Sequence, residues 1–233
     1  MTERSAAALA RDAGTFTVGP SSLAWDGTSL TLRVDERGCP IPRRLAGRIT
    51  LTPEAMGAET VALDAAGRHR WTPFSAYARV SVAFDSPRLA WSGHGYLDSN
   101  AGDEPLAAAF SRWDWARAQA GGEATILYDA DRRDGTRFAL ALAARRDGGF
   151  DRREMPKRHP LPPTRIWRIR RLGHGEAPRI VATLEDTPFY ARSVVAARLF
   201  GREATAVHES LDLDRFATRW VKALLPFRMP RLG

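Results

Sequence analysis

The sequence has a single cysteine, Cys39, in 233 residues. An intrachain disulfide is therefore excluded, and so is a zinc site built on paired cysteines. Lysine is also scarce, because Lys157 and Lys222 are the only ones and arginine carries nearly all of the positive charge. Since unpaired cysteine is typical of reducing compartments, we expect a cytoplasmic protein.

Long apolar runs and common cofactor motifs are missing as well. No stretch approaches the roughly 18 apolar residues of a membrane-spanning helix, and the opening MTERSAAALARDAG lacks the apolar core of a secretory signal. The sequence has no phosphate-binding glycine loop, no nucleophile elbow and no histidine pair at metal-ligand spacing. We therefore expect no cofactor and no metal, which leaves a cofactor-independent reaction or a binding role.

The composition is that of a globular protein, with 44% hydrophobic residues, 27% charged residues and a net charge of +8. The arginines stand beside acids, as in VDERG, DADRRDG and DGGFDRRE. Since no recognition helix, zinc finger or RNA-binding signature accompanies them, we expect no nucleic-acid partner. A basic nucleic-acid binder stays open as an alternative, which strongly salt-dependent binding to DNA would support.

Short runs of alternating apolar and polar residues, separated by Gly, Pro and Asp, predict an all-β protein. The predicted strands of the first block are Ser29–Val34, Leu45–Leu51, Arg79–Phe84 and Arg88–Leu97. The second block has a predicted hairpin of 124–128 and 137–142, which turns near Asp134 and Gly135, and a predicted pair of 164–171 and 179–184. We place one domain at residues 1–106 and a second at 107–233.

One amphipathic helix is predicted near the C-terminus, where apolar residues recur at helical spacing from Leu213 to Leu224. Ser210 or Asp212 is the predicted cap, and Pro226 the predicted end. The helix either packs against a β domain or, because its other side is basic, lies on a membrane surface. The second interpretation predicts a peripheral contact with the inner membrane.

Two segments carry candidate chemistry. Residues two apart on a strand share a face, so His69 and Trp71 of GRHRW project together, and Tyr96 and Asp98 of GHGYLDSNAGDEP do the same. Such a set suits acid-catalysed addition of water to an alkene. A buried carboxyl group stays protonated and donates the proton, aromatic faces stabilise the carbocation, and a histidine orients the water.

Structural interpretations of the same residues stay open at this point. Tryptophans such as Trp71 and Trp91 are commonly core residues, and Asp98 precedes the turn-forming SNAGDEP. The pair Trp113 and Trp115 in FSRWDWARA shares one strand face, which is typical of packing.

The run DSPRLAWSGHGYLDSNAGDEPLAAAFSRWDWARA resembles the carotenoid 1,2-hydratase (hydroxyneurosporene synthase) family. The segments ALDAAGRHRWTPFSAYARVSVAF and PSSLAWDGTSLTLRVDERGCPIPRRLAGRI before it are similar to the family too, and ATILYDADRRDGTRFALAL and RFATRWVKALLPFRMPR after it more loosely. The resemblance thus extends over nearly the whole chain. It implies a hydro-lyase that adds water to the terminal double bond of an acyclic carotenoid such as neurosporene or lycopene.

The resemblance also implies a site. Asp98 is the proton donor, Trp71 and Tyr96 stabilise the cation, and His69 is the partner of the water or of the acid. We add neighbours of these motifs as substrate-binding candidates, namely Trp91, His94 and Asn100. The expected partner is a hydrophobic polyene.

The fold that the resemblance implies is a pair of lipocalin-like antiparallel β-barrel domains, which agrees with the strand pattern. Family members usually have a further stretch ahead of the position of Met1, so we expect a first barrel that lacks strands if the chain is shortened. A binding protein without catalysis and a cyclase on the same fold are the rival functions.

Overall fold

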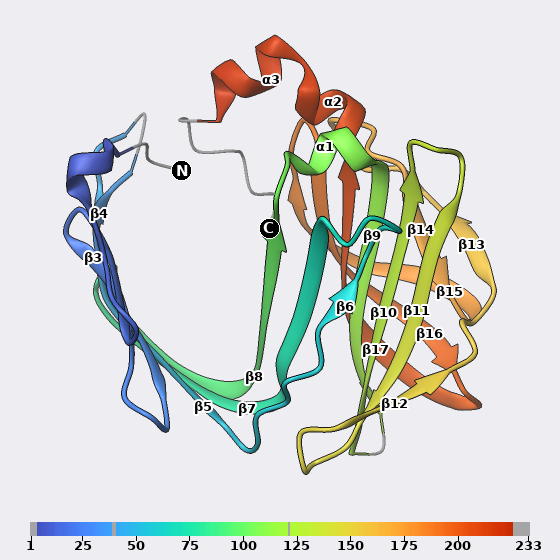
Figure 1. The fold of residues 1–233 in the computed structure, drawn as a ribbon, viewed down its shortest axis with the longest axis horizontal. Coiled ribbons are helices and arrows are strands. Elements are labelled where there is room, and N and C mark those ends of the chain that lie inside the picture. The colour runs from blue at the N-terminus through green and yellow to red at the C-terminus, as the bar shows by residue number, and fades with distance from the viewer. Residues whose placement is uncertain (1–3, 39–40, 121, 226–233) are drawn as a thin grey trace.

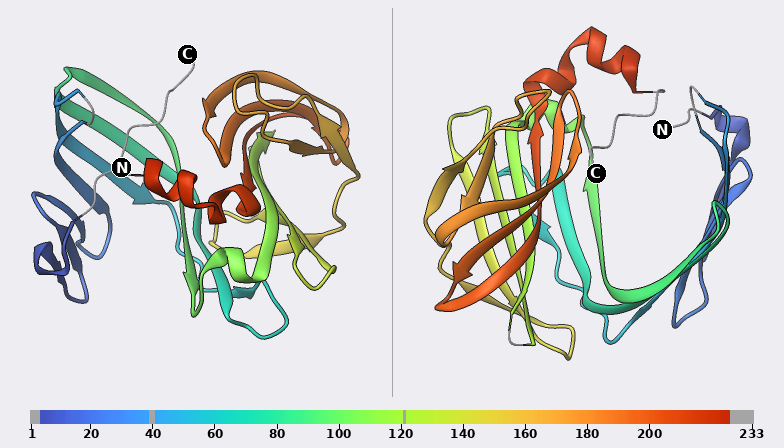
Figure 2. Two further views of the ribbon diagram at one scale, coloured as in Figure 1. Left: turned by 90° about the horizontal axis from the view of Figure 1, so that it is seen from above. Right: turned by 180° about the vertical axis from the view of Figure 1, so that it is seen from behind.

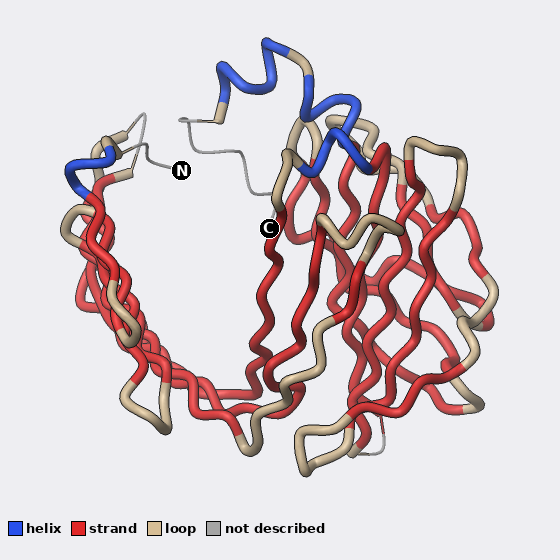
Figure 3. Tube along the Cα trace, viewed as in Figure 1, coloured by secondary structure: helices blue, strands red, loops and turns tan. Residues whose placement is uncertain are grey.

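The computed structural model describes residues 4–38, 41–120 and 122–225, and strands make up most of it (Figures 1 and 3). The strands form two antiparallel sheets that come one after the other along the chain, with a few short helices at one end (Figure 1). The prediction of an all-β fold is therefore confirmed.

The first sheet has eight strands in the order β1-β2-β3-β4-β5-β7-β6, with β8 paired to β7. It follows a 3-10 turn, η1 (Ala6–Ala8). Its strands are β1 (Leu9–Arg11), β2 (Thr15–Val18), β3 (Ser21–Trp25), β4 (Leu30–Arg37), β5 (Arg44–Pro53), β6 (Val61–Ala62), β7 (His69–Ser86) and β8 (Leu89–Gly102).

Apolar side chains on this sheet line up across the strands. Leu32 is opposite Ile49, Ile49 is opposite Val82, and Val82 is opposite Trp91, so all four lie on one face. The alternating pattern of the sequence is the cause of this arrangement, since each of these strands has an apolar residue at every second position.

The two long strands β7 and β8 connect the first sheet to the second. Their register shifts twice, between Thr72 and Ser75 and between Ser75 and Ala78. In Figures 1 and 2 both strands bend strongly and rise along the second sheet. Bulges of this kind bend a strand pair and redirect its side chains. One end of each strand therefore lies in the body of the first sheet, and the other end lies along the second sheet.

The second sheet has seven strands in the order β12-β11-β10-β9-β17-β16-β15, and a separate pair, β13-β14, lies beside it. A helical turn, α1 (Leu106–Ala109), leads into it. The strands are β9 (Phe110–Ala120), β10 (Glu123–Arg132), β11 (Arg137–Ala144), β12 (Phe150–Arg153), β13 (Arg158–Leu161), β14 (Arg171–His174), β15 (Glu176–Asp186), β16 (Tyr190–Leu199) and β17 (Arg202–Asp212). The hairpin predicted around Asp134 and Gly135 is the pair β10-β11.

The larger apolar core lies between the two sheets. It joins Trp71 and Tyr77 of β7 to Phe110, Ile126 and Tyr128 of the second sheet. Pairing among the described residues closes neither sheet into a ring, so closed barrels and the boundary between residues 106 and 107 stay predictions.

The predicted strand 164–171 is wrong, and so is its pairing with 179–184. Residues 162–170 form a connection outside any strand, β14 pairs with β13, and β15 pairs with β16. The physical reason is Asp186, which is fully buried and accepts hydrogen bonds from the backbone N–H groups of Ile166 and Trp167. Those amide groups are thus bound to a side chain and not to a neighbouring strand.

The predicted C-terminal helix is two short helices, α2 (Leu213–Ala217) and α3 (Arg219–Leu224). Thr218 between them is extended and interrupts the helical path. Asp212 caps α2 by accepting from the N–H of Arg215, as predicted, whereas Ser210 points into the second sheet. Pro226 lies outside the described residues. Within the described ranges, no helix is long and apolar enough to cross a membrane.

Candidate active site

Asp98 lies between the two sheets with two hydrogen-bond donors on one carboxyl oxygen. The indole Nε1–H of Trp71 donates to Asp98 Oδ2 over 2.8 Å, and the phenol of Tyr96 donates to the same atom over 3.1 Å. Trp71 is completely buried. The structure therefore brings together three of the four predicted catalytic side chains.

The strand pattern explains why these side chains meet. Tyr96 and Asp98 are two apart on β8, so they share the face that the bend turns toward the second sheet. Trp71 is paired across the strands with Asn100, two residues beyond Asp98. The two register shifts each insert one extra residue into β7, so together they leave the face of Trp71 unchanged and bring it opposite Asn100 and not Gly102.

The second sheet supplies an aromatic wall opposite Asp98. The ring of Trp115 lies 5.3 Å from the ring of Tyr96, and the ring of Tyr128 lies 5.2 Å from those of both Trp71 and Trp113. Trp113 and Trp115 come from one face of β9, and Tyr128 comes from β10. Five aromatic rings from both sheets thus form one cluster, and two of them donate to the Asp98 carboxyl group.

The surroundings raise the pKa of Asp98. Burial is the largest cause, and the negative charge of Glu209 on β17 acts in the same direction. The hydrogen bonds from Trp71 and Tyr96 oppose the shift without cancelling it. The pKa of Tyr96 is raised as well, by burial and then by the charge of Asp98, so its phenol stays a donor. A carboxyl group in this setting keeps its proton more easily than one in water.

Of the three predicted substrate-binding residues, only Asn100 contacts this cluster. Its Oδ1 accepts a hydrogen bond from the Tyr128 hydroxyl over 3.3 Å, and the residue is exposed. Trp91 is half exposed on the apolar face of the first sheet, opposite Val82. His94 is exposed and opposite Arg79. Binding roles for all three stay predictions.

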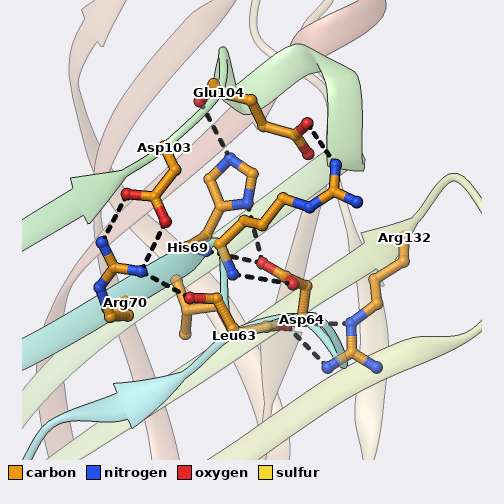
Figure 4. A network of polar contacts seen from close by, with 9 residues as sticks. Leu63, Asp64, His69, Arg70, Asp103, Glu104 and Arg132 are labelled. Carbon is orange, nitrogen blue, oxygen red and sulfur yellow. Dashed lines mark hydrogen bonds and ion pairs between the residues drawn. The ribbon is translucent and has the colours of Figure 1, made fainter.

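His69 is buried beside the site but is directed elsewhere. Its Nδ1 lies 2.9 Å from Asp64 Oδ2 and its Nε2 lies 3.2 Å from the carbonyl oxygen of Glu104 (Figure 4). The ring packs edge-on against Phe110, with 5.2 Å between the centroids. Both ring nitrogens therefore point at oxygen atoms other than those of Asp98, and the predicted role of His69 toward water or acid stays a prediction.

The network around His69 ties three segments together (Figure 4). Asp64 also accepts from the N–H of His69, and although burial opposes the charge, the hydrogen bonds from His69 and the N–H of Arg68 lower the pKa of Asp64. Arg70 forms a bidentate ion pair with Asp103, in which Nη1 donates to Oδ2 and Nη2 donates to Oδ1. These contacts hold the end of β8 against the start of β7, which fixes the spacing between Asp98 and Trp71.

Sequence reasoning assigned Trp113 and Trp115 to packing and did not consider Tyr128 or Glu209. All four come from the second sheet, and only the packing of one sheet on the other brings them to Asp98. The spacing of the two tryptophans on one face of a strand was the available signal. No group of His, Cys, Asp or Glu suited to a metal ion occurs among the residues that the structure describes.

Solved structures share this fold. A putative AttH protein from Nitrosomonas europaea superposes with a TM-score of 0.59 over 89% of this chain and 72% of its own, at 13% identity. CghA, solved with Sch210972, gives a TM-score of 0.54 over 85% of this chain and 69% of its own, at 14% identity. The chain thus has the lipocalin-like fold of the AttH proteins, as predicted.

The sequence matches the carotenoid hydratase CrtC family over residues 1–233, so the chain belongs to that family. The acyclic carotenoid 1,2-hydratase of Thiocapsa roseopersicina is 52% identical over the whole of this chain, and that of Rubrivivax gelatinosus is 48% identical over 99%. The chain spans 58% of the length of each of these two relatives. It spans 84% of the hydratase of Cereibacter sphaeroides, at 38% identity.

Proposed function

We propose that this chain adds water across the terminal carbon–carbon double bond of an acyclic carotenoid such as neurosporene or lycopene. Membership of the carotenoid hydratase family and the names of its relatives support the reaction. The observation that carries the proposal is Asp98, a carboxyl group with a raised pKa inside a ring of aromatic side chains.

The reaction begins with a proton from Asp98. The carboxyl proton goes to the less substituted carbon of the double bond, whose electron pair forms the new C–H bond, and the other carbon becomes a tertiary cation. The N–H of Trp71 and the hydroxyl of Tyr96 then stabilise the carboxylate that is left. Before this step the same two hydrogen bonds lower the pKa of Asp98. Burial raises that pKa by more, so the net shift is upward.

The cation forms next to aromatic faces. An aromatic ring attracts a cation through its quadrupole, by about 2 kcal/mol when water is excluded. Trp71, Tyr96, Trp113, Trp115 and Tyr128 supply five such rings. A hydrocarbon without hydrogen-bonding groups gives a protein little else to hold, so an aromatic lining serves binding and catalysis together.

Water completes the addition by attacking the cation and returning one proton to the Asp98 carboxylate. The products are a tertiary alcohol and the regenerated acid, so one water is consumed and no oxidant or reductant is needed. We assign Asn100 to the water, because its side chain lies at the exposed edge of the site beside Tyr128. His69 contributes by positioning, through the Asp64 network that holds β7 against β8.

The test is expression of this chain in cells that accumulate lycopene or neurosporene, with pigments separated by chromatography and weighed by mass spectrometry. We expect a product heavier by one water and a loss of at least about a thousandfold in Asp98→Asn, since the general acid is removed. The matched control is Asp85→Asn, because Asp85 is an exposed carboxylate on β7 that lies outside the Asp64 network. A pigment of unchanged mass would contradict the proposal, and recovery of bound, unaltered carotenoid would then indicate a binding protein.

A further inference from the structure

A second surface, away from Asp98, combines apolar and basic side chains. The connection 162–170 packs beside α3, where the rings of Trp167 and Trp220 stack with centroids 6.0 Å apart and planes 24° apart. Arg215 of α2 donates to the carbonyl oxygen of Trp167 and holds the two segments together. We call residues 165–168 and α3 the basic tip. In Figure 1 α2 and α3 stand at the helical end of the molecule.

Two large apolar side chains are exposed on the basic tip. Ile166 is 50% exposed and Trp220 is 49% exposed. Hydrogen bonds hold the backbone around Ile166. Asp186 accepts from the N–H of Ile166 over 2.8 Å, and Thr164 Oγ1 accepts from the N–H of Ile169 over 2.8 Å. A backbone held at both ends thus presents Ile166 to the outside.

The cations of the basic tip are unpaired. Among the described residues, Arg165, Arg168, Arg219 and Lys222 are exposed and form no ion pair. Some exposed arginines elsewhere have acidic partners, as Arg146 has in Glu54, while others, such as Arg33 and Arg48, form no ion pair within the described ranges but do not flank an exposed indole on a helix. Asp186 accepts from the backbone of the connection and is fully buried, and it forms no ion pair with these cations among the described residues.

Asp214 pairs with Arg133 and Asp212 pairs with Arg215, so they leave the charge of the tip uncompensated. The basic tip therefore has an excess of positive charge around an exposed isoleucine and an exposed indole. Tryptophan prefers the level of lipid headgroups, an aliphatic side chain inserts below it, and arginine and lysine contact lipid phosphates.

We infer that the basic tip docks the protein onto the surface of an anionic lipid bilayer. The tip is joined to the proposed active site by β17, which carries Glu209 toward Asp98 and runs directly into α2. Docking through the tip would bring that site close to the bilayer that holds a water-insoluble polyene. This advantage depends on the proposed hydration, but lipid binding itself does not.

The test is cosedimentation of the whole chain with vesicles, without any carotenoid. We expect binding to an equal mixture of phosphatidylglycerol and phosphatidylcholine, weak binding to phosphatidylcholine alone, and release as salt screens the charges. Arg219→Gln with Lys222→Gln should weaken binding about fivefold for each charge removed. Arg146→Gln with Arg152→Gln is the matched control, because both arginines are exposed and paired with acids.

The apolar contribution has its own matched pair. Ile166→Ser with Trp220→Ser should abolish vesicle binding and leave the unfolding midpoint unchanged, since both side chains are half exposed. Leu89→Ser with Trp91→Ser removes an equally exposed aliphatic and indole pair from the first sheet and should bind like the parent chain. Loss in the control pair alone would overturn the proposal and assign lipid binding to the first sheet.

Equal binding to neutral and anionic vesicles would also overturn the proposal. So would a dimer in analytical ultracentrifugation that the Ile166→Ser, Trp220→Ser chain cannot form, because the tip would then bind a second copy. The vesicle assay contains no carotenoid. Its failure would therefore contradict the docking proposal alone and would leave the proposed hydration untouched.

Discussion

Two aspartates, the half-buried Asp98 and the buried Asp129, show how the same side chain is kept in opposite states. Asp98 lies between the sheets and receives hydrogen bonds from two neutral groups, while the charge nearby, on Glu209, is negative. Asp129 lies in the second sheet and contacts Arg137 over 2.6 Å and 2.7 Å and His174 over 2.9 Å.

The pKa values follow from these partners. Burial raises the pKa of Asp98, and nothing cationic contacts the carboxyl group among the described residues. Burial opposes the charge of Asp129 too, but hydrogen bonds and charges of His174 and Arg137 lower its pKa to about 2. Asp114 fits the same rule, since burial raises its pKa to about 6 although the hydrogen bond from the neutral Ser210 hydroxyl and the charge of Arg112 oppose the shift. The charge of the partners thus separates a carboxyl group that keeps its proton more easily from a structural anion.

The largest effect on stability is expected for Asp129→Asn. Breaking a buried ion pair costs about 3 kcal/mol of the free energy of unfolding, because the cationic partners lose their counter-charge. The pKa of Asp129 is lowered in the folded state, so its contribution is complete above the usual aspartate pKa and is lost as pH falls toward about 2.

Urea titrations of Asp129→Asn and the parent chain at neutral pH and at acidic pH check this prediction. The difference between the two chains should be large at neutral pH and should shrink on acidification. Asp98→Asn is the matched comparison and should not lower stability at neutral pH. A similar loss of stability in both variants would remove the distinction between the two aspartates.

The sequence predicted the first-sheet residues around Asp98 better than those of the second sheet. Strand alternation and the two-residue spacing placed Tyr96 with Asp98, and the family resemblance added Trp71. The sequence could not show that Trp113 and Trp115 join the aromatic cluster beside Asp98, because that depends on how two sheets with separate strand patterns pack together.

Two limits of strand periodicity have the same cause, a long-range contact. Residues 164–171 alternate like a strand, yet Asp186, buried and distant in the sequence, binds the amides that a strand partner would need. His69 precedes Trp71 by two positions on the same strand face, yet Asp64 and the carbonyl group of Glu104 take its ring nitrogens. Periodicity predicts the face of a strand but not the partner that a polar group finds there.

The next effect in size tests the aromatic wall on the side of the second sheet. Trp115→Leu should lower kcat about tenfold with little change in KM, because the ring attracts the cation and not the neutral polyene. Trp115→Phe, which keeps an aromatic face next to Tyr96, should restore most of the rate. Equal kcat values in the leucine and phenylalanine variants would mean that Trp115 only fills space.

The smallest effect, and the most direct test of the comparison, is expected for Glu209→Gln. The charge of Glu209 helps to raise the pKa of Asp98, so its removal lowers that pKa toward the usual value. The proposed hydration needs protonated Asp98, so we expect the rate of the parent chain to fall as pH rises through this pKa. In the variant the fall should come at a lower pH than in the parent chain.

The other titratable and charged groups near Asp98 do not reverse the expected fall of its pKa. Tyr96 and Tyr128 stay protonated because their pKa values are raised, and Arg117 lies over the Tyr96 ring at 5.7 Å. Arg192 pairs with Glu209 over 2.8 Å, and its freed charge in the variant lowers the pKa of Asp98 further, in the same direction.

Glu203→Gln, an exposed position at the far end of β17, is the matched control. A pH profile that moves equally in both variants, or moves to higher pH in Glu209→Gln, would show that Asp98 is not the acid whose charge state the rate reports.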